Sequence, residues 1–199
     1  MIQVYTQNIN GTWFAIACAE QHIFGTSFGE TEQKVLSSLL GNLPFNLPFQ
    51  VFIAPSAYAK DMFALLENIL EGKDVNLNLN LAVEHLPLYT QRVLKATMQI
   101  PVGYVTSYGL IAKSVGGGPR AVGNVMANNC FAPIVPCHRV VKSDFMLGGY
   151  GGGLKVKYQL LSKEKRGHIS QRIVAVEGRE MQVYPVEFAL KKFDSVFLP

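Results

Sequence analysis

The sequence of 199 residues lacks the features that mark several special classes of protein. No apolar run reaches the roughly 18 residues of a transmembrane helix, so no contact with a membrane is predicted. The first residues lack a basic segment followed by an apolar one, and we therefore expect no secretion signal. The three cysteines form no CxxC pair, and their odd number argues against a disulfide framework. These absences predict a soluble, cytoplasmic protein.

Charged residues are scarce, and each half of the chain has an excess of one sign. Residues 1–86 hold three Lys or Arg and eight Asp or Glu, whereas residues 87–199 hold fifteen and six. The basic second half suggests a polyanionic partner such as nucleic acid. A solvated basic surface without any partner explains the same charges, so charge alone does not decide between the two.

The first 85 residues have the pattern of an α/β unit without internal repeats or identifiable chemistry. Alternating apolar residues predict two strands that pair as a hairpin, and helical spacing predicts two helices, the second capped by Ser56. The expected strands span 13–17, 23–28 and 49–53. One expected helix spans 30–40, the other begins after Ser56 and stops at Gly72, and residues 76–81 form an edge strand or an extended linker.

The pattern changes after residue 86 to short helices separated by Pro and Gly. We expect a helix over 88–98, a second helix over 108–114 capped by Thr106 or Ser107, and a third that Pro119 opens. The last two are joined by Gly116–Gly118, which gives the outline of a helix-turn-helix. Helix pairs with glycine turns are also ordinary packing units, so the outline alone does not establish DNA binding.

Cys137 and His138 are the residues with the most obvious reactive chemistry. A cysteine reacts as its thiolate, and an imidazole that accepts the thiol proton, itself oriented by a carboxylate, supplies that form at neutral pH. A lone cysteine is more often a small buried hydrophobic residue, and a lone histidine a satisfied polar one. Adjacency of the two residues therefore does not by itself predict catalysis.

The strings around Cys137 carry a specific resemblance. PCHRV spans residues 136–140, an Asn precedes the Cys by eight residues, and a glycine-rich loop contains YGGG at 150–153. With PRAVG at 119–123, they resemble the C-terminal domain of the O6-alkylguanine-DNA alkyltransferases over about residues 86–165. A chance match to all of these strings is very improbable.

The resemblance implies an α/β fold in three parts. Residues 1–85 would form a ribonuclease-H-like α/β domain, and residues 86–165 a mostly helical catalytic domain with a DNA-binding helix-turn-helix. Residues 166–199 extend past the usual end of the family. Their pattern predicts a β-hairpin around residues 177–179, with Phe188, Leu190 and Phe193 covering apolar surface.

The resemblance also implies direct repair of alkylated DNA, in which the protein acts once. Cys137 matches the residue that takes the alkyl group from guanine O6, and His138 matches the base that deprotonates it through a water molecule. Glu164 matches the carboxylate that holds the imidazole, and Asn129 matches the residue that braces the active-site turn. Tyr108 matches the phenol that gives a proton to the leaving base.

The implied partner is double-stranded DNA, bound by a monomer through the minor groove with little sequence preference, at the nucleoid if the organism is a prokaryote. Arg120 matches the residue that fills the space left by the flipped-out base. The small residues Ala121, Val122 and Gly123 suit a helix that presses against a groove. Lysines that could contact phosphates are Lys113, Lys142, Lys155 and Lys157.

The base pocket implied by the resemblance is apolar, and the glycine-rich loop forms its edge. Met126, Val135 and Tyr150 would line it, and the carbonyl groups of Cys137 and Val140 would accept from the guanine amino group. Gly151 stands where many family members have Ser. The glycine-rich loop is not a phosphate loop, because no GKS or GKT follows it.

No cofactor and no metal are expected. Cys18 and His22 are the only neighbouring ligands in the first half, two where a closed zinc site needs four. Cys130 is expected to be a buried thiol, with a redox role as the less favoured alternative. Two other functions stay open: a non-catalytic protein that binds alkylated DNA, and a hydrolytic Cys-His-Glu enzyme.

Overall fold

The computed structural model describes residues 1–44, 46–76 and 78–197, which divide into two units. Unit 1 comprises residues 1–70, 74–86 and 130–134, and unit 2 comprises residues 71–73, 87–129 and 135 onward. All candidate catalytic, DNA-binding and base-pocket residues named above belong to unit 2. The mixed α/β class predicted from the sequence is confirmed, since both units combine a sheet with helices.

Unit 1 contains a five-stranded sheet in the order β4-β1-β2-β3-β5. The predicted hairpin is confirmed, because β2 (Thr12–Ala19) pairs antiparallel with β3 (His22–Gly29). β1 (Ile2–Ile9), which the sequence analysis did not predict, pairs antiparallel with β2 and parallel with β4 (Phe49–Phe52). The edge strand β5 (Asn80–Leu81) is the end of the predicted segment 76–81, of which residue 77 lies outside the described residues.

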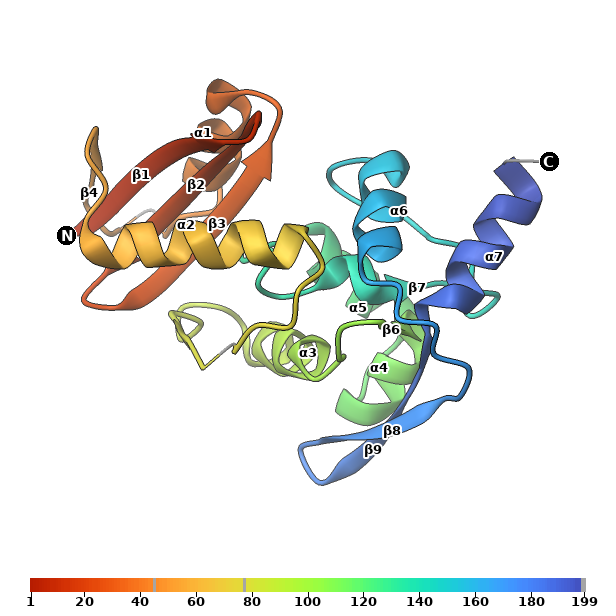
Figure 1. Cartoon of the computed structure of the whole chain (residues 1–199). Helices are drawn as coiled ribbons and strands as arrows, with labels where there is room; N and C mark the ends of the chain where they lie inside the picture. The colour runs from red at the N-terminus through yellow and green to blue at the C-terminus, as the bar shows by residue number, and fades with distance from the viewer. Residues whose placement is uncertain (45, 77, 198–199) are drawn as a thin grey trace. The chain divides into compact units, whose positions relative to one another are not determined.

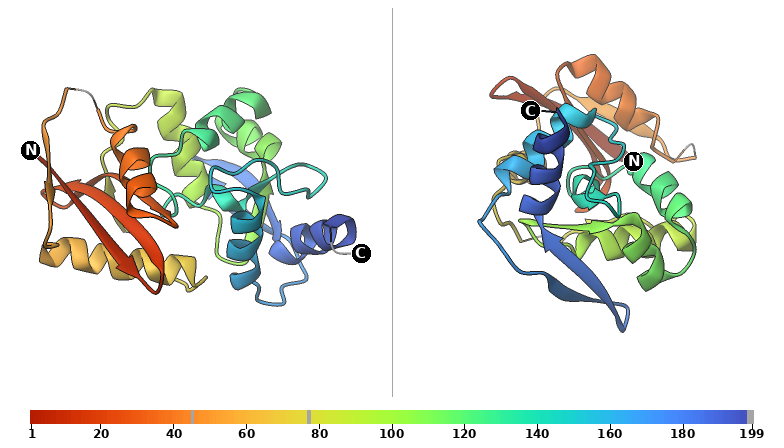
Figure 2. Two further views of the ribbon diagram at one scale, coloured as in Figure 1. Left: turned by 90° about the horizontal axis from the view of Figure 1, so that it is seen from above. Right: turned by 90° about the vertical axis from the view of Figure 1, so that its right-hand side faces the viewer.

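Two helices cover opposite faces of this sheet (Figure 2). α1 (Glu32–Leu40) begins after Thr31, whose side chain accepts from the backbone N–H of Lys34. α2 (Ala57–Leu70) begins after Ser56, whose hydroxyl accepts from the backbone N–H of Ala59. Neighbouring residues of β2 face opposite sides, so this central strand is buried on both faces. The predicted helices and the Ser56 cap are confirmed.

Unit 2 opens with three helices whose predicted positions are also confirmed (Figure 1). They are α3 (Leu88–Met98), α4 (Tyr108–Val115) and α5 (Pro119–Ala127). Of the two predicted caps, Ser107 is the one used, since its hydroxyl accepts from the backbone N–H of Leu110. Gly116 and Gly117 adopt positive φ values between α4 and α5, a conformation that glycine adopts without strain.

The rest of unit 2 adds a four-stranded sheet in the order β7-β6-β9-β8, which the sequence did not predict. β6 (Tyr104–Ser107) leads into α4, and β7 (Val140–Val141) follows a 3-10 turn over Cys137–Arg139. α6 (Leu154–Lys163) follows the glycine-rich loop. β8 (Arg172–Val176) and β9 (Arg179–Pro185) form a hairpin in the tail, where the sequence pattern placed one.

The tail is built into the core of unit 2. β9 pairs with β6, and α7 (Val186–Phe197) packs beside α6 (Figure 1). The Tyr158 hydroxyl on α6 donates to Asp194 on α7 at 2.7 Å, and the rings of Tyr158 and Phe193 lie 4.8 Å apart. Val186, Ala189 and Leu190 join one core cluster with Leu161 of α6 and Val105 of β6. Within the described ranges, no helix is long and apolar enough to cross a membrane.

Candidate active site

Cys137 opens a single 3-10 turn directly after a buried segment. The Asn129 side-chain amide donates to the carbonyl oxygen of Val135 at 2.9 Å, and the Cys137 backbone N–H donates to the same oxygen at 2.8 Å. Asn129 therefore braces the chain two residues before the cysteine. The carbonyl of Cys137 accepts from the backbone N–H of Val140, which leaves its second lone pair for another donor.

Cys137 is 7% exposed, so a substrate has to reach its thiol in a sheltered place. Burial raises the pKa of this thiol, while a hydrogen bond from Asn129 and the positive charge of Lys157 oppose the rise. Burial also raises the pKa of Cys18 and Cys130, to about 11 in each case. Among the three cysteines, Cys137 is the one whose surroundings also contain a nearby cation that stabilises the thiolate.

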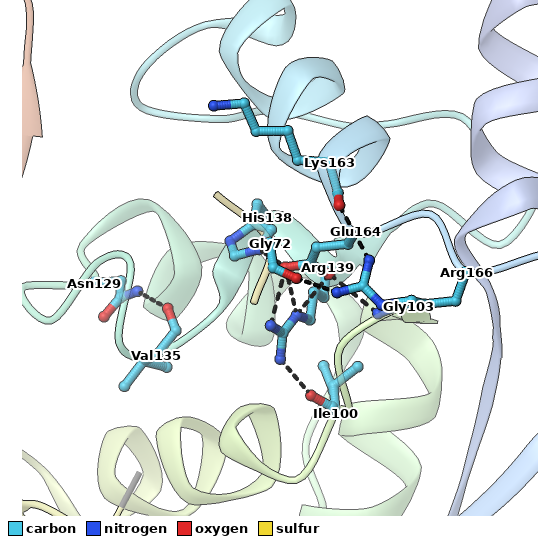
Figure 3. A network of polar contacts seen from close by, with 10 residues as sticks. All are labelled: Gly72, Ile100, Gly103, Asn129, Val135, His138, Arg139, Lys163, Glu164 and Arg166. Atoms are coloured by element: carbon cyan, nitrogen blue, oxygen red, sulfur yellow. Dashed lines mark hydrogen bonds and ion pairs between the residues drawn. The ribbon is translucent and has the colours of Figure 1, made fainter. Parts of the chain in front are cut away.

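His138, Arg139 and Glu164 form a buried polar network, in which two side chains converge on one carboxylate (Figure 3). The His138 Nε2 atom lies 2.8 Å from Glu164 Oε1. Arg139 donates from Nε to both carboxylate oxygens at 3.0 Å and from Nη2 to Oε1 at 2.9 Å. The side chains of His138 and Glu164 are each 1% exposed, so water competes little with these contacts.

The electrostatics of this network favour an ionised Glu164 and a neutral His138. Burial by itself would raise the pKa of the Glu164 carboxyl, but His138 and Arg139 outweigh it and lower the pKa to about 2. Burial lowers the pKa of His138 more than Glu164 raises it, and the charges of Arg139 and Lys157 lower it further. An ionised carboxylate only accepts, so the Nε2 atom of the neutral ring carries the hydrogen.

The opposite ring nitrogen of His138 is then an unused acceptor. Nδ1 is buried and has no hydrogen-bond partner in the part of the chain that the structure describes. A buried polar atom without a partner is costly unless a ligand or water molecule occupies the space beside it. The neighbouring residue along the chain is Cys137, so the free lone pair belongs to the same 3-10 turn as the thiol.

Two tyrosines border the cysteine. Burial and the charge of Cys137 raise the pKa of Tyr108, the first residue of α4, and its hydroxyl packs against Gly148 of the glycine-rich loop. Burial raises the pKa of Tyr150 well above its usual value, with smaller contributions from Cys137 and Glu164. Both phenols thus lie near enough to Cys137 for its charge to raise their pKa.

The prediction that Lys157 contacts a DNA phosphate is wrong, because its ammonium group is buried. The side chain has no exposed surface, and its ammonium donates to the carbonyl oxygens of Val140 at 2.6 Å and Gly149 at 3.4 Å. Burial lowers its pKa to about 8, against which the charge of Cys137 acts. The Val140 carbonyl, expected to face the guanine amino group, already accepts from this ammonium.

The other predicted DNA contacts are distributed on the surface of unit 2. Lys113, Arg120, Lys142 and Lys155 are exposed, and Ala121 and Gly123 of α5 are partly exposed. The prediction that Val122 presses against a DNA groove is also wrong. Its side chain is fully buried and packs inside unit 2.

A hollow of about 470 Å³ lies along the glycine-rich loop. Tyr150 is the predicted base-pocket residue that lines it, together with Leu147, Leu154 and Phe193 of α7 among others. Met126 is 8% exposed and its sulfur accepts from Thr97, while Val135 has no exposed surface. Gly151 is exposed, and a Cβ atom there would meet nothing within 4 Å.

Two buried cations of the site were not predicted as such: Arg139 was given no role, and Lys157 was expected on the surface. For Lys157 a signal was available, because Lys157, Leu160, Leu161 and Glu164 follow the i, i+3, i+4, i+7 pattern of a buried helix face. Arg139 gave no comparable signal beyond its place next to His138. Within residues 1–44, 46–76 and 78–197, no three His, Cys, Asp or Glu side chains gather to hold a metal ion.

Comparison with known proteins places this site in a recognised context. The family model described as 6-O-methylguanine DNA methyltransferase, DNA binding domain, matches residues 88–166. A methylated-DNA–protein-cysteine methyltransferase of Pyrobaculum aerophilum is 60% identical over 65 residues, which are 33% of this chain and 44% of that relative. One of Saccharolobus solfataricus is 39% identical over 104 residues, 52% of this chain and 68% of the relative.

The solved structures agree with the sequence comparison. The O6-methylguanine methyltransferase of Mycobacterium tuberculosis superposes with a TM-score of 0.64 at 29% identity, covering 83% of this chain and 93% of that one. A structure of the same mycobacterial protein in complex with DNA gives a TM-score of 0.64 at 28% identity, covering 82% of this chain and 92% of that one. The likeness therefore extends well beyond the region that the family model matches.

Proposed function

Because this chain belongs to the family of methylated-DNA–protein-cysteine methyltransferases, we propose that it repairs DNA directly, by moving the alkyl group of O6-alkylguanine onto Cys137. The observation that carries the proposal is the pairing of a sheltered thiol with a neutral imidazole. The unpartnered Nδ1 atom of that imidazole can take a proton, and its Nε2 atom is fixed by Glu164.

The reaction follows from the chemistry of these groups. The Cys137 thiol passes its proton to Nδ1 of His138 through one water molecule, and the thiolate attacks the alkyl carbon on guanine O6. A sulfur–carbon bond forms as the carbon–oxygen bond breaks, and its electron pair stays with the base. The base gains one proton, supplied by Tyr108, and leaves as guanine. The site residues described above cannot cleave the thioether formed on Cys137, so each protein molecule acts once.

Double-stranded DNA is the partner that suits this reaction. The exposed Lys113, Arg120, Lys142 and Lys155 are cations that can meet phosphates, and the mycobacterial relative was solved in complex with DNA. We place α4 and α5 as a helix-turn-helix whose second helix enters the minor groove. Such binding depends on phosphates and groove shape and needs little sequence preference.

The target base has to leave the duplex, since a stacked base cannot bring O6 to a buried thiol. Arg120 lies in the first turn of α5 and is exposed, which suits a side chain that fills the vacated space. The glycine-rich loop and Tyr150 would then close around the extruded base. In this proposal the protein works as a monomer and needs no cofactor.

The division of the chain belongs to the same proposal. Residues 86–165 carry the reaction and the DNA contacts, and the extension 166–199 contributes β9 and α7 to the core of their unit. For residues 1–85 we keep the ribonuclease-H-like description, supported by three consecutive antiparallel strands with a parallel strand on each edge.

The test is to incubate the protein with duplex DNA that contains O6-methylguanine and to locate the methyl group by mass spectrometry. Trypsin cleaves after Arg120 and Arg139, so Cys130 and Cys137 lie on one peptide and fragmentation has to separate them. A peptide methylated at Cys137 is expected from the wild type and from Cys130→Ser, and no methylated form of this peptide is expected from Cys137→Ser. Tight binding without any transfer would instead indicate a non-catalytic binder, and continued turnover would indicate a hydrolase.

A further inference from the structure

Arg139 is a buried cation with hydrogen bonds from three of its nitrogen atoms, although the reaction above assigns it no role. It is 5% exposed. Its Nε and Nη2 atoms donate to the Glu164 carboxylate at 2.9 to 3.0 Å, and its Nη1 atom donates to the carbonyl oxygen of Ile100 at 2.7 Å (Figure 3). The guanidinium is therefore fixed in position and direction.

The charges in this pocket can be counted. Glu164 carries one negative charge and Arg139 carries one permanent positive charge, so the pair is neutral. A protonated His138 would add a second positive charge to the same buried space, where the ammonium of Lys157 is already nearby. Adding an unbalanced charge to a site of low dielectric is costly, so the ring remains neutral while Arg139 is present.

We propose that Arg139 is a positioning residue for alkyl transfer: it neutralises Glu164, so that His138 stays uncharged and keeps Nδ1 free to accept the proton of Cys137. This inference rests on the proposed function and adds a residue to it. The carboxylate still orients the ring through Nε2, but it no longer draws a proton onto the ring. Orientation and basicity are thus set by two different residues.

Removing the guanidinium charge should have a defined consequence. Glu164 would keep its negative charge uncompensated, and His138 would take a proton to balance it. Both ring nitrogens would then be donors, and neither could accept the thiol proton. The titratable and charged groups around His138 are Lys157 on α6, Glu164 directly after α6, and Cys137 and Arg139 on either side of it in the chain, with Tyr150 of the glycine-rich loop near Glu164. Of these, only Arg139 changes in the experiment.

The experiment measures the titration of His138 and the pH dependence of alkyl transfer from free O6-benzylguanine, which requires no DNA. Arg139→Met removes the charge and keeps an apolar stem, and Arg139→Lys keeps the charge. His138→Gln identifies the His138 signal among the four histidines by nuclear magnetic resonance. Arg92→Met is the matched control, since it removes a half-exposed arginine that pairs with Glu177 at 2.9 Å.

The proposal predicts that Arg139→Met raises the His138 midpoint, and the acid limb of the rate profile with it, by about one pH unit or more. Arg139→Lys and Arg92→Met should leave both near the wild-type values. Equal midpoints in wild type and Arg139→Met would overturn the proposal, because a merely structural arginine would change the amount of folded protein and not the titration.

The wild type provides a measurement that does not depend on a variant folding. Nitrogen chemical shifts at neutral pH should show His138 as a neutral ring with its hydrogen on Nε2, and an imidazolium would overturn the proposal. The magnetic-resonance titrations of His138, in the wild type and in Arg139→Met, are independent of catalysis. A wild type that fails to react with O6-benzylguanine would therefore count against the proposed function, while the role of Arg139 in setting the charge of His138 would still be decided.

Discussion

The ammonium nitrogen of Lys157 lies 2.6 Å from the carbonyl oxygen of Val140, and the lysine side chain has no exposed surface. The same ammonium reaches the carbonyl oxygen of Gly149 at 3.4 Å, so it joins the strand after Cys137 to the glycine-rich loop. A buried cation at this point does two things. It holds the loop in place, and its charge favours the thiolate form of Cys137.

Replacing Lys157 by Met should slow the reaction of Cys137 with iodoacetamide at neutral pH. Without the positive charge, the effect of burial is less compensated, and the pKa of the thiol rises. Each unit of pKa corresponds to about a tenfold smaller thiolate fraction. Modification of Cys137 is followed by mass spectrometry. Lys155→Met is the control, since Lys155 is exposed on the same helix. Equal rates in wild type and Lys157→Met would contradict this role for the charge.

Glu164→Gln should change the pH dependence of stability. The folded-state pKa of Glu164 is about 2, below its ordinary value of 4.5, so the carboxylate stabilises the fold above pH 4.5 and loses this effect as the pH falls toward 2. A shift of this size corresponds to about 3 kcal/mol at neutral pH. Urea unfolding at neutral and acidic pH should show a wild-type advantage that shrinks below pH 4.5. An advantage that does not vary with pH would refute this.

The elements that could be predicted from the sequence are those defined by local signals. α4 has an N-cap serine at Ser107, α5 has Pro119 in its first turn, and glycines separate the two. His138 was found because it lies within the PCHRV motif at 136–140. Each of these signals acts over a few residues, so no tertiary information was needed.

The elements that could not be predicted depend on partners far away in the chain. β6 has four residues between a turn and a helix, and it becomes a strand because Tyr104 pairs with Pro185 and Val105 with Tyr184. Arg139 gains its role only when α6 brings Glu164 to it. Such pairings are long-range, and neither local propensity nor spacing reveals them.

Leu190→Ala should destabilise unit 2, because the tail is part of its core. Leu190 is 6% exposed and packs in the cluster that includes Val105 and Leu161. Truncating a buried leucine costs about 2 to 5 kcal/mol through lost burial and the cavity that remains. Urea unfolding gives the value. Ile173→Ala is the matched control, since Ile173 is 63% exposed and its loss should change stability by about 0.5 kcal/mol or less.

Arg120→Ala should slow repair of duplex DNA much more than it slows the reaction with free O6-benzylguanine. Extruding a base costs a few kcal/mol, and a side chain that fills the hole offsets part of this. Each 1.36 kcal/mol is tenfold in rate, so a loss of roughly 10- to 1000-fold on duplex is expected. The measurement is the single-turnover rate at saturating duplex, beside the rate with the free base. Arg120 is exposed, so the variant should fold normally.

A phosphate contact at Arg120 would behave differently from a side chain that replaces the flipped base. Losing one phosphate contact weakens binding and lowers the slope of log binding constant against log salt concentration by about one unit. Saturating DNA then restores the rate. Lys113→Ala should show this pattern, because Lys113 is an exposed cation in the last turn of α4. If the repair rate of Arg120→Ala recovers at saturating duplex, Arg120 is a phosphate contact like Lys113. Equal rate losses on duplex and on the free base would indicate a damaged fold. A rate on duplex that stays low at saturation, with a normal rate on the free base, is the result that base replacement requires.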